Sequence, residues 1–115
     1  MPEDRYQRIW KTVAEIPAGR VMSYGEVAKS AGLPRHARFV SVALKRAPKD
    51  MALPWHRVIN GQGRISFPKN SNAYRQQKKR LREEGVRFDK DTVAVEHRFD
   101  SVEDVDRLLW GPQES

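Results

Sequence analysis

The spacing of apolar side chains predicts three helices in the first half of the chain. Between residues 4 and 16 apolar positions recur at the intervals of one helix face, and Pro17, Ala18 and Gly19 then end the pattern. A short helix is expected over residues 25–31, closed by Gly32. A longer one is expected over residues 35–47. Its buried stripe would comprise Val40, Ala43, Leu44 and Ala47.

The second half predicts a short extended segment, a turn and a fourth long helix. Residues 57–60 are predicted to be extended, and the turn sequence Asn60-Gly61-Gln62-Gly63 favours a hairpin or wing between Val58-Ile59 and Arg64-Ile65. Ser71 is expected to cap a helix over residues 72–84 that ends at Gly85. In the tail we expect a strand over residues 92–99 and a last helix over residues 101–109.

The second and third helices together predict a helix-turn-helix. They are separated by a tight turn, and the exposed face of the longer one carries basic and small side chains, Arg38, Ser41 and Lys45 among them. With 115 residues, 38% of them hydrophobic, the chain can bury one modest core. We therefore expect a mainly α fold with a small β hairpin or wing, built around a winged-helix-like helix-turn-helix.

The charge is distributed unevenly and suggests a division at residue 90. The formal net charge is +7, but residues 1–90 carry 20 Lys and Arg against 8 Asp and Glu, whereas residues 91–115 carry 2 against 7. A strongly basic body favours a polyanionic partner such as nucleic acid. We expect one basic domain over residues 1–90, followed by an acidic C-terminal extension over residues 91–115 that forms a strand and a short helix packed on the domain.

Nothing in the sequence predicts a membrane span, a secretion signal or a metal site. No apolar run approaches the roughly 20 residues that a span needs, and the first residues are polar and charged rather than signal-like. The three histidines, His36, His56 and His97, are scattered and there is no cysteine. We expect a cytoplasmic protein, associated with the nucleoid if it is bacterial, that needs neither metal nor cofactor.

Four motifs, in order along the chain, carry a resemblance to a known family. They are Tyr24-Gly25-Glu26-Val27-Ala28, Ala37-Arg38-Phe39-Val40, Pro54-Trp55-His56-Arg57-Val58-Ile59-Asn60 and Glu84-Gly85-Val86. Over residues 6–88 the chain thus resembles the C-terminal, DNA-binding domain of the O6-alkylguanine-DNA alkyltransferases. In that family the second residue of Pro-Cys-His-Arg-Val accepts the alkyl group. The Pro-Trp-His-Arg-Val form is the mark of the alkyltransferase-like proteins, which recognise alkylated guanine without repairing it.

The substitution at Trp55 removes the chemistry of the alkyltransferases. Alkyl transfer needs a group that is nucleophilic and easily deprotonated, and an indole is neither. No other cysteine can replace it, because the chain contains none. We therefore expect a protein that is not an enzyme.

The resemblance implies a DNA-binding surface on the helix-turn-helix. Arg38 matches the family's finger residue, which enters the base stack from the minor groove and takes the place of a flipped nucleotide. Tyr24 matches the tyrosine that presses on the target's 3′ phosphate. The remaining residues expected on this surface are Arg35, Ala37, Ser41 and Lys45.

The same resemblance implies a lesion pocket without catalytic machinery. Trp55 would form its wall where the nucleophile stands in relatives, and the other expected pocket residues are Tyr24, Pro54, Val58 and Lys69. Lys69 is included because Pro68 occupies the position where some members place an arginine, and Ala47 replaces the family's hinge asparagine. His56 and Glu84 match the pair that activates the cysteine, and without a thiol they are interpreted as a retained scaffold.

Together these features predict a protein that docks in the minor groove of double-stranded DNA, flips an O6-alkylguanine without removing the alkyl group, and flags the lesion for nucleotide excision repair proteins. We expect a monomer. Two other classes remain open at this stage. A winged-helix transcription regulator would use the same basic surface to recognise an operator sequence. A protein-interaction module acting through the acidic tail would show no lesion preference.

Overall fold

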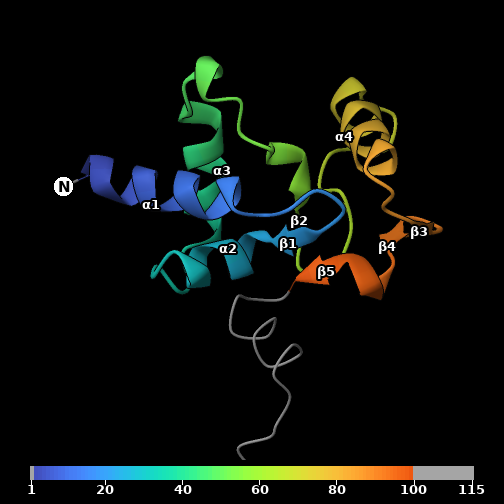
Figure 1. The fold of residues 1–115 in the computed structure, drawn as a ribbon, viewed down its shortest axis with the longest axis horizontal. Helices are drawn as coiled ribbons and strands as arrows, with labels where there is room; N and C mark the ends of the chain where they lie inside the picture. The colour runs from blue at the N-terminus through green and yellow to red at the C-terminus, as the bar shows by residue number, and fades with distance from the viewer. Residues whose placement is uncertain (1, 100–115) are drawn as a thin grey trace, which may run out of the picture.

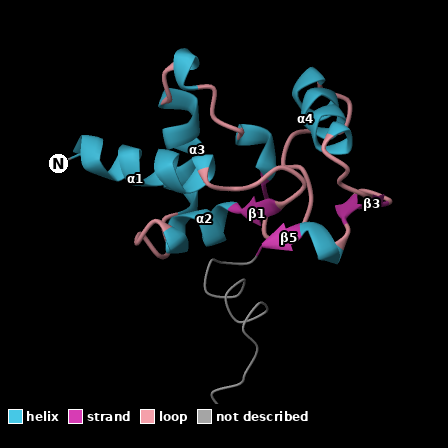
Figure 2. Ribbon diagram, in the orientation of Figure 1, coloured by secondary structure: helices cyan, strands magenta, loops and turns pink. Residues whose placement is uncertain are grey.

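The computed structural model describes residues 2–99, which form four α-helices, five short strands and three 3₁₀ turns labelled η (Figures 1 and 2). Their order is α1 (Pro2–Ala14), β1 (Val21–Ser23), α2 (Tyr24–Ser30), α3 (Ala37–Arg46), η1 (Lys49–Met51), η2 (Trp55–Arg57), β2 (Val58–Ile59), α4 (Asn72–Glu83), β3 (Phe88–Asp89), β4 (Thr92–Val93), η3 (Val95–His97) and β5 (Arg98–Phe99). The predicted mainly α fold with a small hairpin is confirmed.

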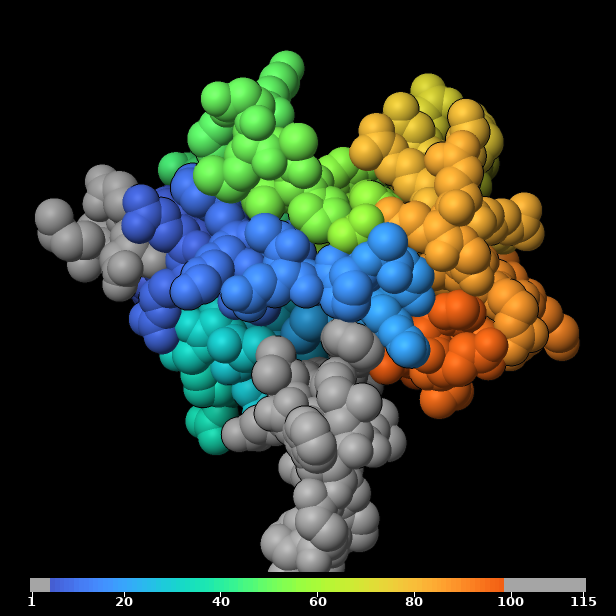
Figure 3. Space-filling view, viewed as in Figure 1, coloured from blue at the N-terminus to red at the C-terminus, as the bar shows by residue number. Residues whose placement is uncertain are grey.

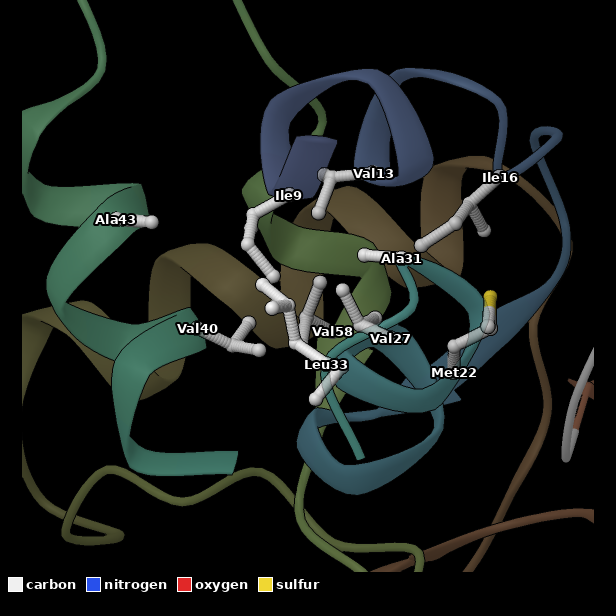
Figure 4. Close-up of a cluster of buried hydrophobic side chains, with 11 residues drawn as sticks. Ile9, Val13, Ile16, Met22, Val27, Ala31, Leu33, Val40, Ala43 and Val58 are labelled. Atoms are coloured by element: carbon white, nitrogen blue, oxygen red, sulfur yellow. The ribbon is translucent and has the colours of Figure 1, made fainter. Parts of the chain in front are cut away.

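Helices α1, α2 and α3 enclose the larger of two hydrophobic cores. Figure 4 shows side chains from all three helices converging on one interior, which confirms the predicted helical spacing. Trp10 closes one side of this core, where its indole N–H donates to the carbonyl of Ala43 at 2.7 Å. The fully buried members include Ile9, Val13, Val27, Ala28, Val40 and Ala43.

The turn between α2 and α3 is set by two residues in the left-handed backbone region. Gly32 has φ +79°, and the adjacent Leu33 N–H bonds back to the carbonyl of Ala28 at 2.8 Å, which closes α2 as predicted. Arg35 also has a positive φ of 69°. Because a helix cannot continue through that conformation, α3 begins at Ala37 rather than at Arg35. Arg35 therefore lies in the turn, not in the helix.

The main sheet is parallel, with strand order β2-β1-β5. Met22 of β1 lies opposite Val58 of β2 on one side and Phe99 of β5 on the other. The predicted hairpin between Val58-Ile59 and Arg64-Ile65 is wrong, because both residues of β2 are buried and pair with β1 instead. Only its turn exists, closed by the Asn60 N–H donating to the carbonyl of Arg64 at 2.9 Å.

The small antiparallel hairpin instead joins β3 to β4, with Phe88 opposite Val93 and Lys90 in the turn at φ +59°. The predicted continuous strand over residues 92–99 is also wrong. The chain turns at η3, where the N–H of His97 bonds to the carbonyl of Ala94, before β5 joins the main sheet. The helix expected over residues 101–109 lies outside the described residues, and the domain division at residue 90 stays a prediction.

Helix α4 packs on the strands through the second core, which contains Val21, Ile59, Leu81, Val86 and Val93. As predicted, its first turn is capped by Ser71, which accepts from the N–H of Tyr74 at 3.1 Å, and Gly85 follows its end at φ +88°. Of the helices in residues 2–99, none has the length and apolarity required to cross a bilayer.

Replacement of Leu81 by alanine tests the second core. Leu81 is fully buried, so Leu81→Ala should lower the free energy of unfolding by about 2–5 kcal/mol through lost contacts and an unfilled cavity. Urea denaturation followed by circular dichroism measures this. The exposed neighbour variant Arg82→Ala should stay within about 0.5 kcal/mol of the wild type. Equal effects of the two substitutions would contradict the packing described.

Candidate functional site

A pocket of about 440 Å³ lies between α3 and α4. Figure 3 shows the segment containing α3 and the segment containing α4 projecting on either side of a hollow in the surface. The walls combine apolar and hydroxyl or amide side chains, and Lys45 is the charged residue among them. The lining residues are Tyr24, Ser41, Leu44, Lys45, Trp55, Ser66, Phe67, Ala73 and Gln76.

Trp55 presents its ring to this pocket from η2 and is held by residues from two other segments. The ring of Phe67 meets it edge to face, with centroids 6.3 Å apart and planes at 81°. The guanidinium of Arg80, on α4, lies 5.6 Å from the centroid of the indole. An aromatic pair and a cation–π contact each favour a defined ring orientation. Trp55 therefore offers a flat, positioned surface on which a planar ligand can pack.

Tyr24 is the first residue of α2 and contacts the loop between β2 and α4. Its hydroxyl lies 3.0 Å from Oγ of Ser66, so the two groups share a hydrogen bond. The ring packs against the larger core while remaining part of the pocket lining. This arrangement leaves the tyrosine hydroxyl beside the pocket and fixes its direction.

The exposed face of α3 carries the residues predicted to contact DNA. Arg38 and Lys45 are exposed, and Ala37 and Ser41 are partly exposed. Arg38, Ser41 and Lys45 are separated by three and four residues and therefore share one face of the helix. The guanidinium of Arg38 has no hydrogen bond or ion pair with any residue in the described part of the chain. Arg35 is exposed in the preceding turn.

Three of the predicted pocket residues lie elsewhere. Val58 is 1% exposed and packs in the larger core, so its assignment to the pocket lining is wrong; it supports the pocket from within. Lys69 is also outside the lining, because its ammonium pairs with the carboxylate of Asp91. Pro54 is partly buried beside Trp55 and does not line the pocket. Of the predicted pocket residues, the structure brings together Tyr24 and Trp55, with Ser41 and Lys45 from the predicted DNA surface.

The carboxylate of Glu84 is the centre of a hydrogen-bond network behind Trp55. It accepts from Nε2 of His56 at 2.7 Å and from Nη2 of Arg57 at 2.7 Å. The backbone N–H of Gly19 adds a third contact at 3.2 Å. Burial alone would raise the pKa of this carboxyl, but the hydrogen bonds from Arg57, His56 and Gly19 outweigh burial and lower the pKa to about 2. Glu84 is thus ionised throughout the neutral range.

The sequence analysis missed Gln77, which fixes the backbone of the Trp55 segment. Its side chain is buried at 1% exposure, and its Nε2 donates to the carbonyls of His56 and Val58, both at 2.9 Å. The signal was present in the spacing of Tyr74, Gln77 and Leu81, which places all three on the buried face of one helix. A polar residue on such a face must find buried partners.

The contacts of Phe67 and Arg80 with Trp55 were not predicted, because they depend on α4 and the preceding loop lying against Trp55, which local spacing does not reveal. In residues 2–99, no three His, Asp or Glu side chains lie close enough together to hold a metal ion.

Comparison with known proteins gives consistent matches across the chain. Residues 4–86 match the family model "6-O-methylguanine DNA methyltransferase, DNA binding domain". Alkyltransferase-like protein 1 of Schizosaccharomyces pombe is 44% identical over 110 residues, which cover 96% of this chain and 97% of that protein. The DNA base-flipping protein of Escherichia coli K12 is 56% identical over 66 residues, covering 56% of this chain and 51% of that protein.

A solved structure shares the fold. The crystal structure of S. pombe Atl1 in complex with damaged DNA containing O6-carboxymethylguanine is similar with a TM-score of 0.70 and 38% identity. The similarity covers 87% of this chain and 97% of that one.

The pH dependence of stability tests the Glu84 network. Because the folded-state pKa of Glu84 is about 2, below its ordinary 4.5, its contribution is complete above about pH 5 and is lost as the pH falls toward 2. Glu84→Gln should therefore be less stable than wild type by about 2 kcal/mol at pH 7, and the gap should narrow between pH 5 and 2. Denaturant unfolding at several pH values measures the gap. The exposed control Glu83→Gln should leave stability nearly unchanged at pH 7; a pH-independent gap for Glu84→Gln would refute the assignment.

Proposed function

The chain belongs to the 6-O-methylguanine DNA methyltransferase DNA-binding family as an alkyltransferase-like member, and we propose that it binds O6-alkylguanine in duplex DNA without removing the alkyl group. The observation that carries the proposal is that Trp55 lines the pocket and that the chain contains no cysteine. Aromatic and polar side chains suited to holding a base line the pocket, whereas the acceptor of an alkyl group is missing.

The pocket has the size and lining expected for one flipped nucleobase. At about 440 Å³ it falls within the range of small-molecule sites. Trp55 and Phe67 supply aromatic and apolar surface for the purine and its alkyl substituent, and Ser41 and Gln76 supply hydrogen-bonding groups. Extrusion of a nucleotide costs a few kcal/mol, and less when the base already pairs poorly, so damage itself favours entry.

The exposed face of α3 is suited to the minor groove beside this pocket. Arg38 is exposed and has no intramolecular partner among the described residues, so it is free to enter the base stack. A planar guanidinium can stack on bases and donate to the orphaned partner of the flipped nucleotide. The partly exposed Ala37 and Ser41 allow close approach, and Tyr24 at the pocket would press on the adjacent phosphate.

A protein of this kind marks a lesion for other proteins. Since no cysteine in the chain can accept the alkyl group, the adduct stays in the DNA until another activity acts on it. We propose that nucleotide excision repair proteins take over the complex and that the chain binds as a monomer. The retained recognition residues and the absent nucleophile together support this order of events.

Binding to matched duplexes tests the proposed function. The protein should bind a duplex with one O6-methylguanine at least about tenfold more tightly than the same duplex with guanine, a difference of about 1.4 kcal/mol. Anisotropy of a labelled duplex gives the affinities, tryptophan emission reports the occupied pocket, and mass spectrometry of both components reports the adduct. Equal affinities would favour an operator-binding regulator or an interaction module. Loss of the methyl group or a methylated protein would contradict recognition without repair.

Removal of the guanidinium of Arg38 tests the docking mode. Arg38→Ala should weaken binding to the lesion duplex by about 1–3 kcal/mol because the inserted stacking and hydrogen-bonding group is lost. Lys29→Ala on the exposed side of α2 removes the same charge and should have a much smaller effect. Wild-type affinity of Arg38→Ala would exclude its insertion into the base stack.

A further inference from the structure

Helix α4 carries a second charged surface, separate from the pocket lining. Ala73 and Gln76 face the pocket, whereas four cations on another side of the helix surround a shallow hollow of about 430 Å³. The hollow is lined by Tyr74, Arg75, Lys78, Lys79, Arg82 and Glu83. Three exposed cations of this set, Arg75, Lys79 and Arg82, are called the α4 stripe below.

Within the described residues, no acidic side chain neutralises the stripe. In residues 2–99, none of its three members forms an ion pair, and Glu83 is the acid in the hollow. Arg75 is nevertheless oriented, since its guanidinium donates to the carbonyl of Asn70 at 3.2 Å and to Oδ1 of Asn72 at 2.8 Å. The neighbouring Lys78 is held over the rings of Tyr74 and Phe88, at 5.7 and 5.2 Å from their centroids.

The spacing of the stripe matches a nucleic-acid backbone. Arg75 and Arg82 are seven residues apart, about 10 Å along the helix at its rise of about 1.5 Å per residue. That length equals about three steps between phosphates of one strand, each a rise of about 3.4 Å, so it spans about four consecutive phosphates. Positions 75, 79 and 82 also lie about a quarter of a turn around the helix from Gln76. The stripe therefore adjoins the rim of the pocket.

We propose that the α4 stripe binds backbone phosphates of the duplex on one flank of the lesion. This rests on the proposed function. A duplex that delivers a nucleotide to a pocket between α3 and α4 extends past both helices, so the outer side of α4 meets the DNA of one arm. The contact is sequence-independent, adds affinity, and leaves the choice between damaged and undamaged guanine to the pocket.

Asymmetric duplexes separate this contact from general attraction between a basic protein and DNA. The lesion is placed with one arm of about 5 base pairs and the other of about 20, about half a turn and two turns, and a second duplex reverses the arms. Lys79→Gln/Arg82→Gln removes two stripe charges. Lys11→Gln/Lys29→Gln removes two exposed charges from α1 and α2 and is the matched control.

The stripe variant should bind one of the two asymmetric duplexes about tenfold more weakly than wild type and the other nearly normally. On the affected duplex, the slope of log affinity against log salt concentration should become shallower by about two, since each lost phosphate contact contributes about 0.9. Its ratio of affinities for O6-methylguanine and guanine should not change. The charge-preserving variant Lys79→Arg/Arg82→Lys should restore binding, and circular dichroism confirms that each variant is folded.

Each other result has a distinct meaning. Equal weakening on both duplexes, or equal weakening by the control variant, would show general electrostatic attraction and overturn the flank contact. Wild-type affinity of the stripe variant on both duplexes would overturn it as well. If the wild type does not prefer the lesion over guanine, the proposed function fails. If the wild type prefers the lesion but the stripe variant shows no difference between the arms, the flank contact alone fails.

Discussion

The site depends on the hydrogen bonds that the ionised carboxylate of Glu84 accepts. It accepts hydrogen bonds from Gly19, His56 and Arg57, so it joins the end of α4 to the loop before β1 and to η2. Arg57 extends the connection to the turn after α1 by donating to the carbonyl of Ile16 at 2.7 Å. Charge-assisted hydrogen bonds are the stronger kind, and here they converge on one group. The position of Trp55, which precedes His56, follows from this network and from the hold of Gln77 on the backbone.

This arrangement explains why the residues around Trp55 can persist without a nucleophile. A carboxylate whose pKa is held near 2 by Arg57 and His56 is a weak base, and its hydrogen bonds serve to fix neighbouring segments. His56 is buried and directs Nε2 toward Glu84, where it contributes to the same fixation. The His56–Glu84 pair is thus useful to any protein that must present residue 55 at a defined place, whatever the side chain there.

Local periodicity was enough to predict the helices, whereas the errors arose where distant segments meet. The Gly32 closure and the Ser71 cap depend on residues close in sequence and were predicted correctly. The partner of Val58-Ile59 depends on which strand lies beside it, and an apolar pair does not specify that partner. The pocket assignment of Val58 failed for a related reason. Residues of the Trp55 motif lie in a tight 3₁₀ turn, where successive side chains point in different directions: Trp55 faces the pocket, His56 meets Glu84, and Val58 enters the core beyond the turn.

Under the proposed function, helix α4 serves binding rather than catalysis. Gln77 and Leu81 anchor one face in the interior, Gln76 faces the pocket, and Arg80 contacts the ring of Trp55. An enzyme gains rate only from contacts that are stronger in the transition state than in the bound substrate. A protein that retains its ligand gains from every contact made in the bound state. An indole in place of a thiol then helps, because it offers more apolar surface that the ligand can cover, and removing apolar surface from water is favourable. The same reasoning favours a ring that is fixed before binding, since its side chain then loses less conformational entropy when the base enters.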